Sequence, residues 1–153
     1  MTSTLTSLRG LHRMRDGVLE RLDDADLAFG PGGNSLPFGQ LFDDVAALEQ
    51  SYVDSLRHHV QQWPSSDRPR QSAGGTAQLR ERFSALDAAM EAAVVASSNG
   101  EDARVTRPDG TIRTPHAQVE IYTQALFVFL GKAVVYLQAM GKDLPPSVAH
   151  FIG

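Results

Sequence analysis

The chain has 153 residues, of which 42% are hydrophobic and 21% charged, proportions that fit one folded domain over residues 1–153 and exclude wholesale disorder. Its formal net charge is −4 and its basic residues are scattered, so nothing in the composition favours a nucleic-acid partner. The chain has no cysteine, which excludes disulfides, thiolate ligands and a cysteine nucleophile and is compatible with a cytoplasmic location.

Two amphipathic helices are predicted in the first half of the chain. The first covers residues 4–22, and its apolar stripe consists of Leu8, Leu11, Val18 and Leu22. In this helix Gly10 and Gly17 lie seven residues apart and leave room for the close approach of another helix. The loop FGPGGNS leads to a second helix over residues 35–63, whose seam follows a three-four spacing: Leu41, Val45, Leu48, Tyr52, Leu56 and His59.

A third helix follows the linker PSSDRPRQSAGG. It covers residues 76–99, with a regular seam of Leu79, Phe83, Leu86, Met90 and Ala93. If extended, the linker of about a dozen residues reaches roughly 40 Å, the length of the second helix. A parallel crossover between the second and third helices is therefore possible, although it is not required.

A small β-hairpin and a fourth helix complete the predicted elements. The alternating segment VTRPDGTIR contains a Pro-Asp-Gly turn and predicts the hairpin. Thr114-Pro115 is a cap followed by an N1 proline, which predicts a helix over residues 115–140. Its longest apolar stretch, Ala125–Leu137, is interrupted by Gly131 and Lys132 and is shorter than the about 20 residues of a membrane span. We expect no membrane partner and an irregular tail from Lys142 that lies against the helices.

The predicted elements indicate an all-α protein, a four-helix bundle with one hairpin between helices three and four. The order of the segments resembles the DinB/YfiT-like superfamily. DDADLAFGPGGNS is similar to the stretch before that family's second helix, and PFGQLFDDVAALEQSY is similar to the helix itself, with the characteristic glutamate at Glu49. The ending GKAVVYLQAMGKDLPP is similar to the end of the family's last helix. The resemblance implies an up-down-down-up bundle, often dimeric, in a superfamily that includes thiol-dependent transferases and isomerases.

The resemblance also implies a divalent metal, such as Zn or Ni, held by one histidine of helix two and two of helix four. In this chain those positions are occupied by Asp44, Ala125 and Phe129. Asp44 can still ligate a metal, whereas the other two side chains have no ligand atom. We therefore expect a degenerate metal site without a cofactor, with Phe129 filling the space of the missing imidazole.

Other histidines offer weaker candidates for a metal site. His116 and Glu120 stand at i and i+4, a spacing that can hold one ion together with Asp43 or Asp44, but we favour the simpler interpretation of a favourable acid and a solvated histidine at a helix N-terminus. His58 and His59 are adjacent, so they point about 100° apart on a helix. We expect one of them to face the seam and the other to face solvent.

The remaining polar residues do not assign a catalytic site. His12 has no evident partner in the sequence, and no serine stands in a nucleophile arrangement with a histidine and an acid. If Asp44 faces the core it needs a polar partner, and Tyr122, Gln124 and Lys132 of the last helix are the candidates for a pocket around it.

Two classes of function remain open from the sequence. One is a DinB-like bundle that has lost its metal chemistry and binds a small molecule or serves as a scaffold. The alternative is an enzyme of that class, such as a low-molecular-weight-thiol S-transferase, with a repositioned metal or a metal-free pocket. The consecutive apolar residues 125–130 surround helix four, so we expect a homodimer through that helix unless the tail covers its outer face.

Overall fold

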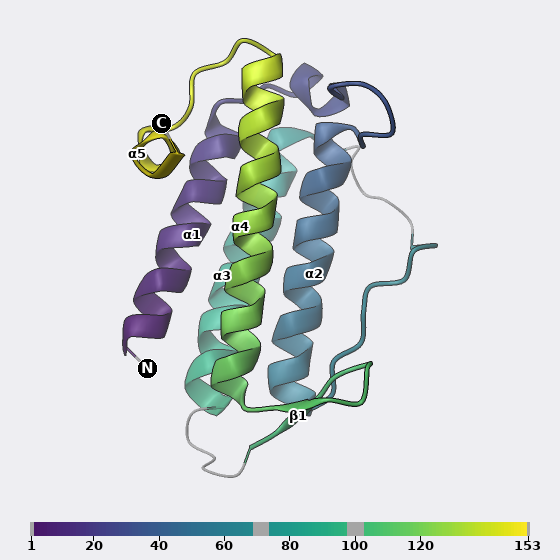
Figure 1. The fold of residues 1–153 in the computed structure, drawn as a ribbon, viewed down its shortest axis with the longest axis vertical. Coiled ribbons are helices and arrows are strands. Elements are labelled where there is room, and N and C mark those ends of the chain that lie inside the picture. Colours follow the sequence, from purple (N-terminus) through teal and green to yellow (C-terminus); the bar gives the residue numbers. More distant parts are fainter. Residues whose placement is uncertain (1, 69–73, 98–102, 153) are drawn as a thin grey trace.

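The computed structural model describes residues 2–68, 74–97 and 103–152, and it is all-α apart from one small hairpin (Figure 1). Its elements in chain order are α1 (Thr2–Glu20), the 3-10 turn η1 (Ala25–Ala28), α2 (Phe38–His58), α3 (Gly75–Ser97), β1 (Val105–Thr106), β2 (Ile112–Arg113), α4 (Pro115–Ala139) and α5 (Pro146–Ile152). The helical class and the hairpin predicted from the sequence are confirmed. The predicted end of the third helix, residues 98–99, lies outside the described residues.

The relative directions of the four long helices follow from contacts near their ends. Arg82 of α3 pairs with Asp43 of α2, each near the start of its helix, so α2 and α3 run parallel. Arg9 of α1 pairs with Glu91 near the end of α3, so these two helices are antiparallel. Figure 1 shows α1 and α4 running upward and α2 and α3 running downward.

Helix α2 is shorter than the sequence predicted at both ends. It begins at Phe38, after Pro37, because the proline ring disfavours the helical conformation of the residue before it, Leu36. It ends at His58, since His59 adopts the left-handed conformation with φ of 62°. The chain then turns back along α2 and reaches its first half, where Arg68 contacts Asp44. This return makes the parallel crossover possible.

The starts of α4 and of the hairpin match the sequence prediction. Thr114 Oγ1 accepts a hydrogen bond from the Ala117 N–H at 3.2 Å, and Pro115 is the first helical residue, as expected for this pair. The strands pair antiparallel, with Val105 opposite Arg113. Gly110 in the turn has a φ of 79°, a conformation that glycine adopts without steric cost.

Helix α4 is long and apolar enough to cross a membrane by length and composition alone, with a mean hydropathy of 1.3 in its most apolar window. Ten of its residues are buried against the other elements. Phe129 packs on Phe42 with ring centroids 5.2 Å apart, and Tyr136 packs on Phe38 at 4.7 Å. The apolar character of α4 is therefore used at least in part for the core.

The tail is helical, which corrects the expectation of an irregular segment. Helix α5 lies beside α1 (Figure 1), and Val148 is fully buried there. A Cβ atom at Gly17 would stand only 3.2 Å from Cβ of Pro145, so this glycine permits the close approach. Because the tail packs on α1, it leaves Val128 and Val135 on the outer face of α4 exposed by 61% and 54%.

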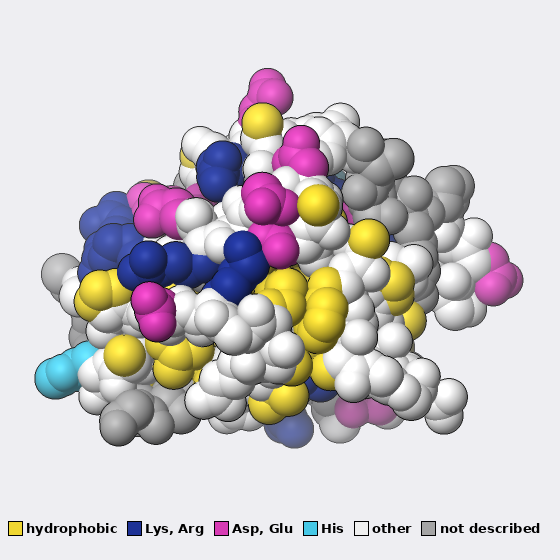
Figure 2. Space-filling view, turned by 90° about the horizontal axis from the view of Figure 1, so that it is seen from above, with side chains coloured by type: hydrophobic (Ala, Val, Ile, Leu, Met, Phe, Trp, Pro, Cys, Tyr) yellow, Lys and Arg dark blue, Asp and Glu magenta, His cyan; other side chains and the backbone are white. Residues whose placement is uncertain are grey.

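The end of the molecule where α4 leads into the tail is closed by polar contacts. Lys142 Nζ lies 2.7 Å from an oxygen of Asp26 and donates to the carbonyl of Arg21 at 3.1 Å. Figure 2 looks onto this end and shows acidic and basic side chains next to one another around small apolar patches. The visible face therefore does not carry a field of a single sign.

Candidate functional site

A group of five polar side chains lies between the four long helices, and we call it the central cluster. It consists of His12 and Arg15 from α1, Glu49 from α2, Asp87 from α3 and Tyr122 from α4. The residues His12, Arg15, Glu49 and Tyr122 are all at most 3% exposed. Each long helix thus contributes to one buried polar site, although the interior around it is apolar.

Arg15 connects the carboxylates of the cluster. Its Nη1 donates to Asp87 Oδ1 at 3.0 Å and to Glu49 Oε2 at 3.2 Å, and its Nη2 donates to Asp87 Oδ2 at 2.8 Å. Nε and Nη2 also donate to Asp16 at the surface. The guanidinium lies 4.0 Å from the centre of the Phe83 ring. All of these contacts favour a charged, fixed arginine.

His12 stands between the two carboxylates and the phenol. Its Nδ1 lies 2.9 Å from Asp87 Oδ1, and its Nε2 lies 3.5 Å from Glu49 Oε1 and 3.3 Å from the hydroxyl of Tyr122. Among the residues that the structure describes, Oε1 of Glu49 is a buried side-chain oxygen that accepts no hydrogen bond. One carboxylate oxygen in the interior is therefore left facing an imidazole nitrogen.

The pKa values of the two carboxylates of the cluster are shifted in opposite directions. Burial raises the pKa of Glu49 to about 8, although the positive charge of Arg15 acts in the other direction. Burial would also raise the pKa of Asp87, but its contacts with His12 and Arg15 outweigh this and lower it to about 2. Burial and the nearby charge of Glu49 raise the pKa of Tyr122. Asp87 is thus the permanently charged partner of Arg15, and Glu49 can hold a proton.

From the sequence alone His12 was expected to lack a partner, and this expectation is wrong. His12 and Arg15 are three residues apart and lie on the same stripe as Leu8, so the helical period places them inward. Glu49 lies four residues after Val45 on the seam of α2 in the same way. Polar residues at seam positions of two helices are the signal in the sequence that indicates a buried polar cluster.

The positions that the family resemblance assigns to a metal do not fit one. Asp44 is a partly exposed carboxylate that pairs with Arg68. Phe129 is buried against Phe42, and Ala125 has no ligand atom. A single carboxylate that already binds an arginine does not hold a transition metal against water. The expected buried pocket around Asp44 is not formed either, since Tyr122 belongs to the central cluster while Gln124 and Lys132 are exposed.

The other sequence candidates lie at the surface. His116 Nε2 is 3.3 Å from Glu120 Oε1, and the two side chains are 62% and 59% exposed, so they form a solvated pair. It is distant in the fold from Asp43, whose carboxylate is buried and pairs with Arg82. His58 and His59 are both exposed, which corrects the expectation that one faces the seam. The reason is the end of α2, which turns the backbone away at His59.

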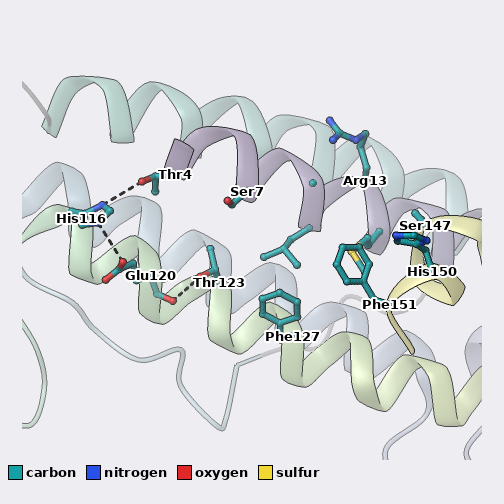
Figure 3. Close-up of a pocket in the computed structure, with 13 residues that line it drawn as sticks. Thr4, Ser7, Arg13, His116, Glu120, Thr123, Phe127, Ser147, His150 and Phe151 are labelled. Carbon is teal, nitrogen blue, oxygen red and sulfur yellow. Dashed lines mark hydrogen bonds and ion pairs between the residues drawn. The ribbon is translucent and has the colours of Figure 1, made fainter. Parts of the chain in front are cut away.

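A second candidate site is a surface groove of about 970 Å³ between α1, α4 and α5, which we call the α1–α4 groove (Figure 3). Its apolar lining is formed by Leu11, Met14, Phe127 and Phe151. Its polar lining includes Thr4, Ser7, His116, Glu120 and Thr123. Figure 3 shows this polar group toward the start of α1 and α4 and the ring of Phe127 between the two ends of the groove. Toward α5, the ring of Phe151 lies together with Arg13, Ser147 and His150.

No protein-family model and no curated protein sequence matches this chain. The candidate sites therefore rest on the geometry of this chain alone.

Proposed function

We propose that this chain is an up-down-down-up four-helix bundle of the DinB-like type whose family metal site is degenerate, and that it binds a small amphipathic molecule in the α1–α4 groove. The parallel pairing of α2 with α3 and the antiparallel pairing of α1 with α3 support the bundle order. The observation that carries the binding function is the groove itself, which combines exposed aromatic rings with polar side chains at both of its ends.

The lining of the groove defines the class of ligand. Phe127 and Phe151 are exposed by 55% and 71%, so a ligand that covers them removes apolar surface from water at about 25 cal/mol per Å². At the end near the start of α1 and α4, Thr4 Oγ1 lies 3.3 Å from His116 Nδ1, and Nε2 of the same ring lies 3.3 Å from Glu120 Oε1. This end offers both donors and acceptors to a polar head group.

The length of the groove limits the size of the ligand. Its lining on α1 extends from Thr4 to Met14, which corresponds to roughly 15 Å along a helix at 1.5 Å per residue. A single medium-length acyl chain or a bicyclic aromatic body with one polar head has this length. We therefore expect molecules of this size, rather than a large cofactor, to bind.

The binding function is tested with a fluorescent naphthalene probe and its displacement by decanol, decanoate and decylamine. We expect saturable binding to the wild type and a loss of about tenfold or more in affinity in Phe127→Ser, because the substitution removes an apolar wall. Val95→Ser is the matched control, since Val95 is 50% exposed on α3 and lies outside the groove. Equal affinity in both variants, or no saturable binding, would contradict the proposal.

We also propose a homodimer through the outer face of α4. Val128 and Val135 are seven residues apart and both exposed, and a Cβ atom at Gly131 between them would meet no other atom within 4 Å. A partner helix could thus approach this stripe closely. Light scattering at micromolar concentration checks this: we expect a dimer for the wild type and a monomer for Val128→Asp, and a monomeric wild type at all concentrations would overturn it.

A further inference from the structure

The central cluster places one nitrogen of His12 and one carboxylate oxygen of Glu49 3.5 Å apart. Asp87 lies at Nδ1 of His12, which leaves Nε2 as the nitrogen that faces the interior of the cluster. Glu49 Oε1 is buried and accepts no hydrogen bond within the described residues. These two atoms point into the same space, next to the hydroxyl of Tyr122.

The distances between these atoms match those of ligands that share one ion. Two ligand atoms at ~2.1 Å from a tetrahedral metal stand about 3.4 Å apart. His12 Nε2 lies 3.5 Å from Glu49 Oε1 and 3.3 Å from the Tyr122 hydroxyl. One ligand atom each from His12, Glu49 and Asp87 lies within 4.8 Å of the other two. An ion can therefore be accommodated with small side-chain adjustments.

The formal charges of the cluster leave room for one cation. Glu49, Asp87 and Asp16 all contact Arg15 and together carry three negative charges when ionised, whereas Arg15 supplies one positive charge, so two negative charges are left for a divalent cation. Arg15 binds both oxygens of Asp87 and only Oε2 of Glu49, so it does not occupy Oε1. An uncompensated carboxylate is costly in the interior, and a bound cation removes this cost.

The edge of the cluster reaches solvent at Asp87. Asp87 has a side chain that is 22% exposed and lines a surface depression of about 270 Å³ between α1 and α3. Asp16 and Glu20 lie at the same depression, with Arg80 as the basic residue there. A mostly acidic entrance raises the local concentration of cations.

We propose that the central cluster is a binding site for one divalent first-row transition-metal ion, with His12 Nε2 and Glu49 Oε1 as ligands and the Tyr122 oxygen beside them. Asp87 then acts as a positioning residue that holds the His12 ring through Nδ1, the arrangement in which an outer carboxylate orients a metal-bound histidine. The imidazole and carboxylate donors suit Zn²⁺, Co²⁺ or Ni²⁺ better than Mg²⁺ or Ca²⁺. This site differs from the positions Asp44, Ala125 and Phe129 that the family resemblance implies.

The experiment is a titration of chelator-treated full-length protein with Zn²⁺ by calorimetry and with Co²⁺ by visible absorption, followed by elemental analysis after dialysis. For the wild type we expect one ion per chain. With Co²⁺ we expect the visible absorption bands of a site of low coordination number. Glu49→Gln keeps the shape of the side chain and removes its charge, and His12→Gln removes the imidazole. Both variants should lose stoichiometric binding, and Asp87→Asn should weaken it by about 10- to 100-fold.

Controls separate this site from surface binding and from misfolding. His58→Gln removes an exposed histidine of α2 that lies outside both candidate sites and should leave the stoichiometry and affinity unchanged. Circular dichroism of each variant must match the wild type before its titration is interpreted, and Glu49→Gln is the variant most compatible with folding because its amide replaces a carboxyl group of the same size. If folded Glu49→Gln binds Zn²⁺ as well as the wild type, or if the wild type binds none, the proposal is overturned.

Discussion

The central cluster and the α1–α4 groove share helices α1 and α4, yet they differ in burial and in the kind of side chain that they enclose or expose. Tyr122 points into the cluster and is fully buried, whereas the next residue, Thr123, lines the groove. In the cluster, polar groups bind one another in an apolar interior; in the groove, apolar side chains are open to water. One helix can therefore contribute to a buried polar cluster on its inner face and to a surface groove about 100° further around its axis.

The largest expected effect comes from the arginine of the cluster. Arg15→Ala leaves the buried Glu49 and the partly buried Asp87 without the positive charge of the guanidinium. We therefore expect the free energy of unfolding to fall by about 3–5 kcal/mol. Arg9→Ala is the matched control, because Arg9 also joins α1 to an acid of α3 but is exposed, and it should change stability far less. Urea unfolding at pH 7 measures both. Similar losses in the two variants would remove the distinction between a buried and an open polar contact.

The two faces of α4 give a second test of the comparison. Phe129→Ala removes a ring that packs against Phe42 in the core and should lower the free energy of unfolding by about 3–5 kcal/mol. Phe127→Ala, two residues earlier, removes a ring of the groove and should change it by about 1 kcal/mol or less. Thermal unfolding of the two variants decides this. A large loss in Phe127→Ala would mean that the groove is part of the stabilising core.

A smaller effect is expected from a buried amide that is fully paired. Gln118 Nε2 donates to Ser55 Oγ at 3.1 Å and to Gln61 Oε1 at 2.6 Å, and its Oε1 accepts from Arg107. We expect Gln118→Ala to lower the free energy of unfolding by about 1–3 kcal/mol, because it leaves buried partners unpaired. Denaturant titration checks the value. No change would show that water replaces the amide, and the loss should stay below that of Arg15→Ala.

The smallest effect concerns an acid at the surface. The N–H and hydroxyl of Thr76 donate to Asp24 Oδ1 at 2.7 and 2.9 Å, and these bonds lower the pKa of Asp24. An acid whose pKa is lowered on folding stabilises the protein above its ordinary pKa and loses this contribution as the pH falls through the lowered value. The difference in melting temperature between wild type and Asp24→Asn should therefore shrink from pH 7 to pH 3. A difference that is independent of pH would contradict this.

Local patterns in the sequence were sufficient to predict the four long helices and most of their inward faces. The Thr114-Pro115 pair marks the start of α4, the Pro-Asp-Gly turn marks the hairpin, and the seam Leu79, Phe83, Leu86 and Met90 is buried as its spacing predicts. These features depend on residues within a few positions of one another, so their physics is contained in the local sequence. Even locally, the prediction was wrong at the end of α2, because the left-handed conformation of His59 has no strong sequence signal.

Only the tertiary structure decided which inward faces meet. Periodicity places His12, Glu49 and Asp87 on the inner faces of three helices, but it does not state the relative height or direction of those helices. The parallel return of α2 to α3 and the antiparallel pairing of α1 with α3 set these heights, and they bring residues 34 and 72 positions from Arg15 into hydrogen-bond distance of it. The groove likewise exists because α5 packs against Gly17 instead of covering α4. Long-range contacts therefore created both candidate sites, while the sequence determined the helices that carry them.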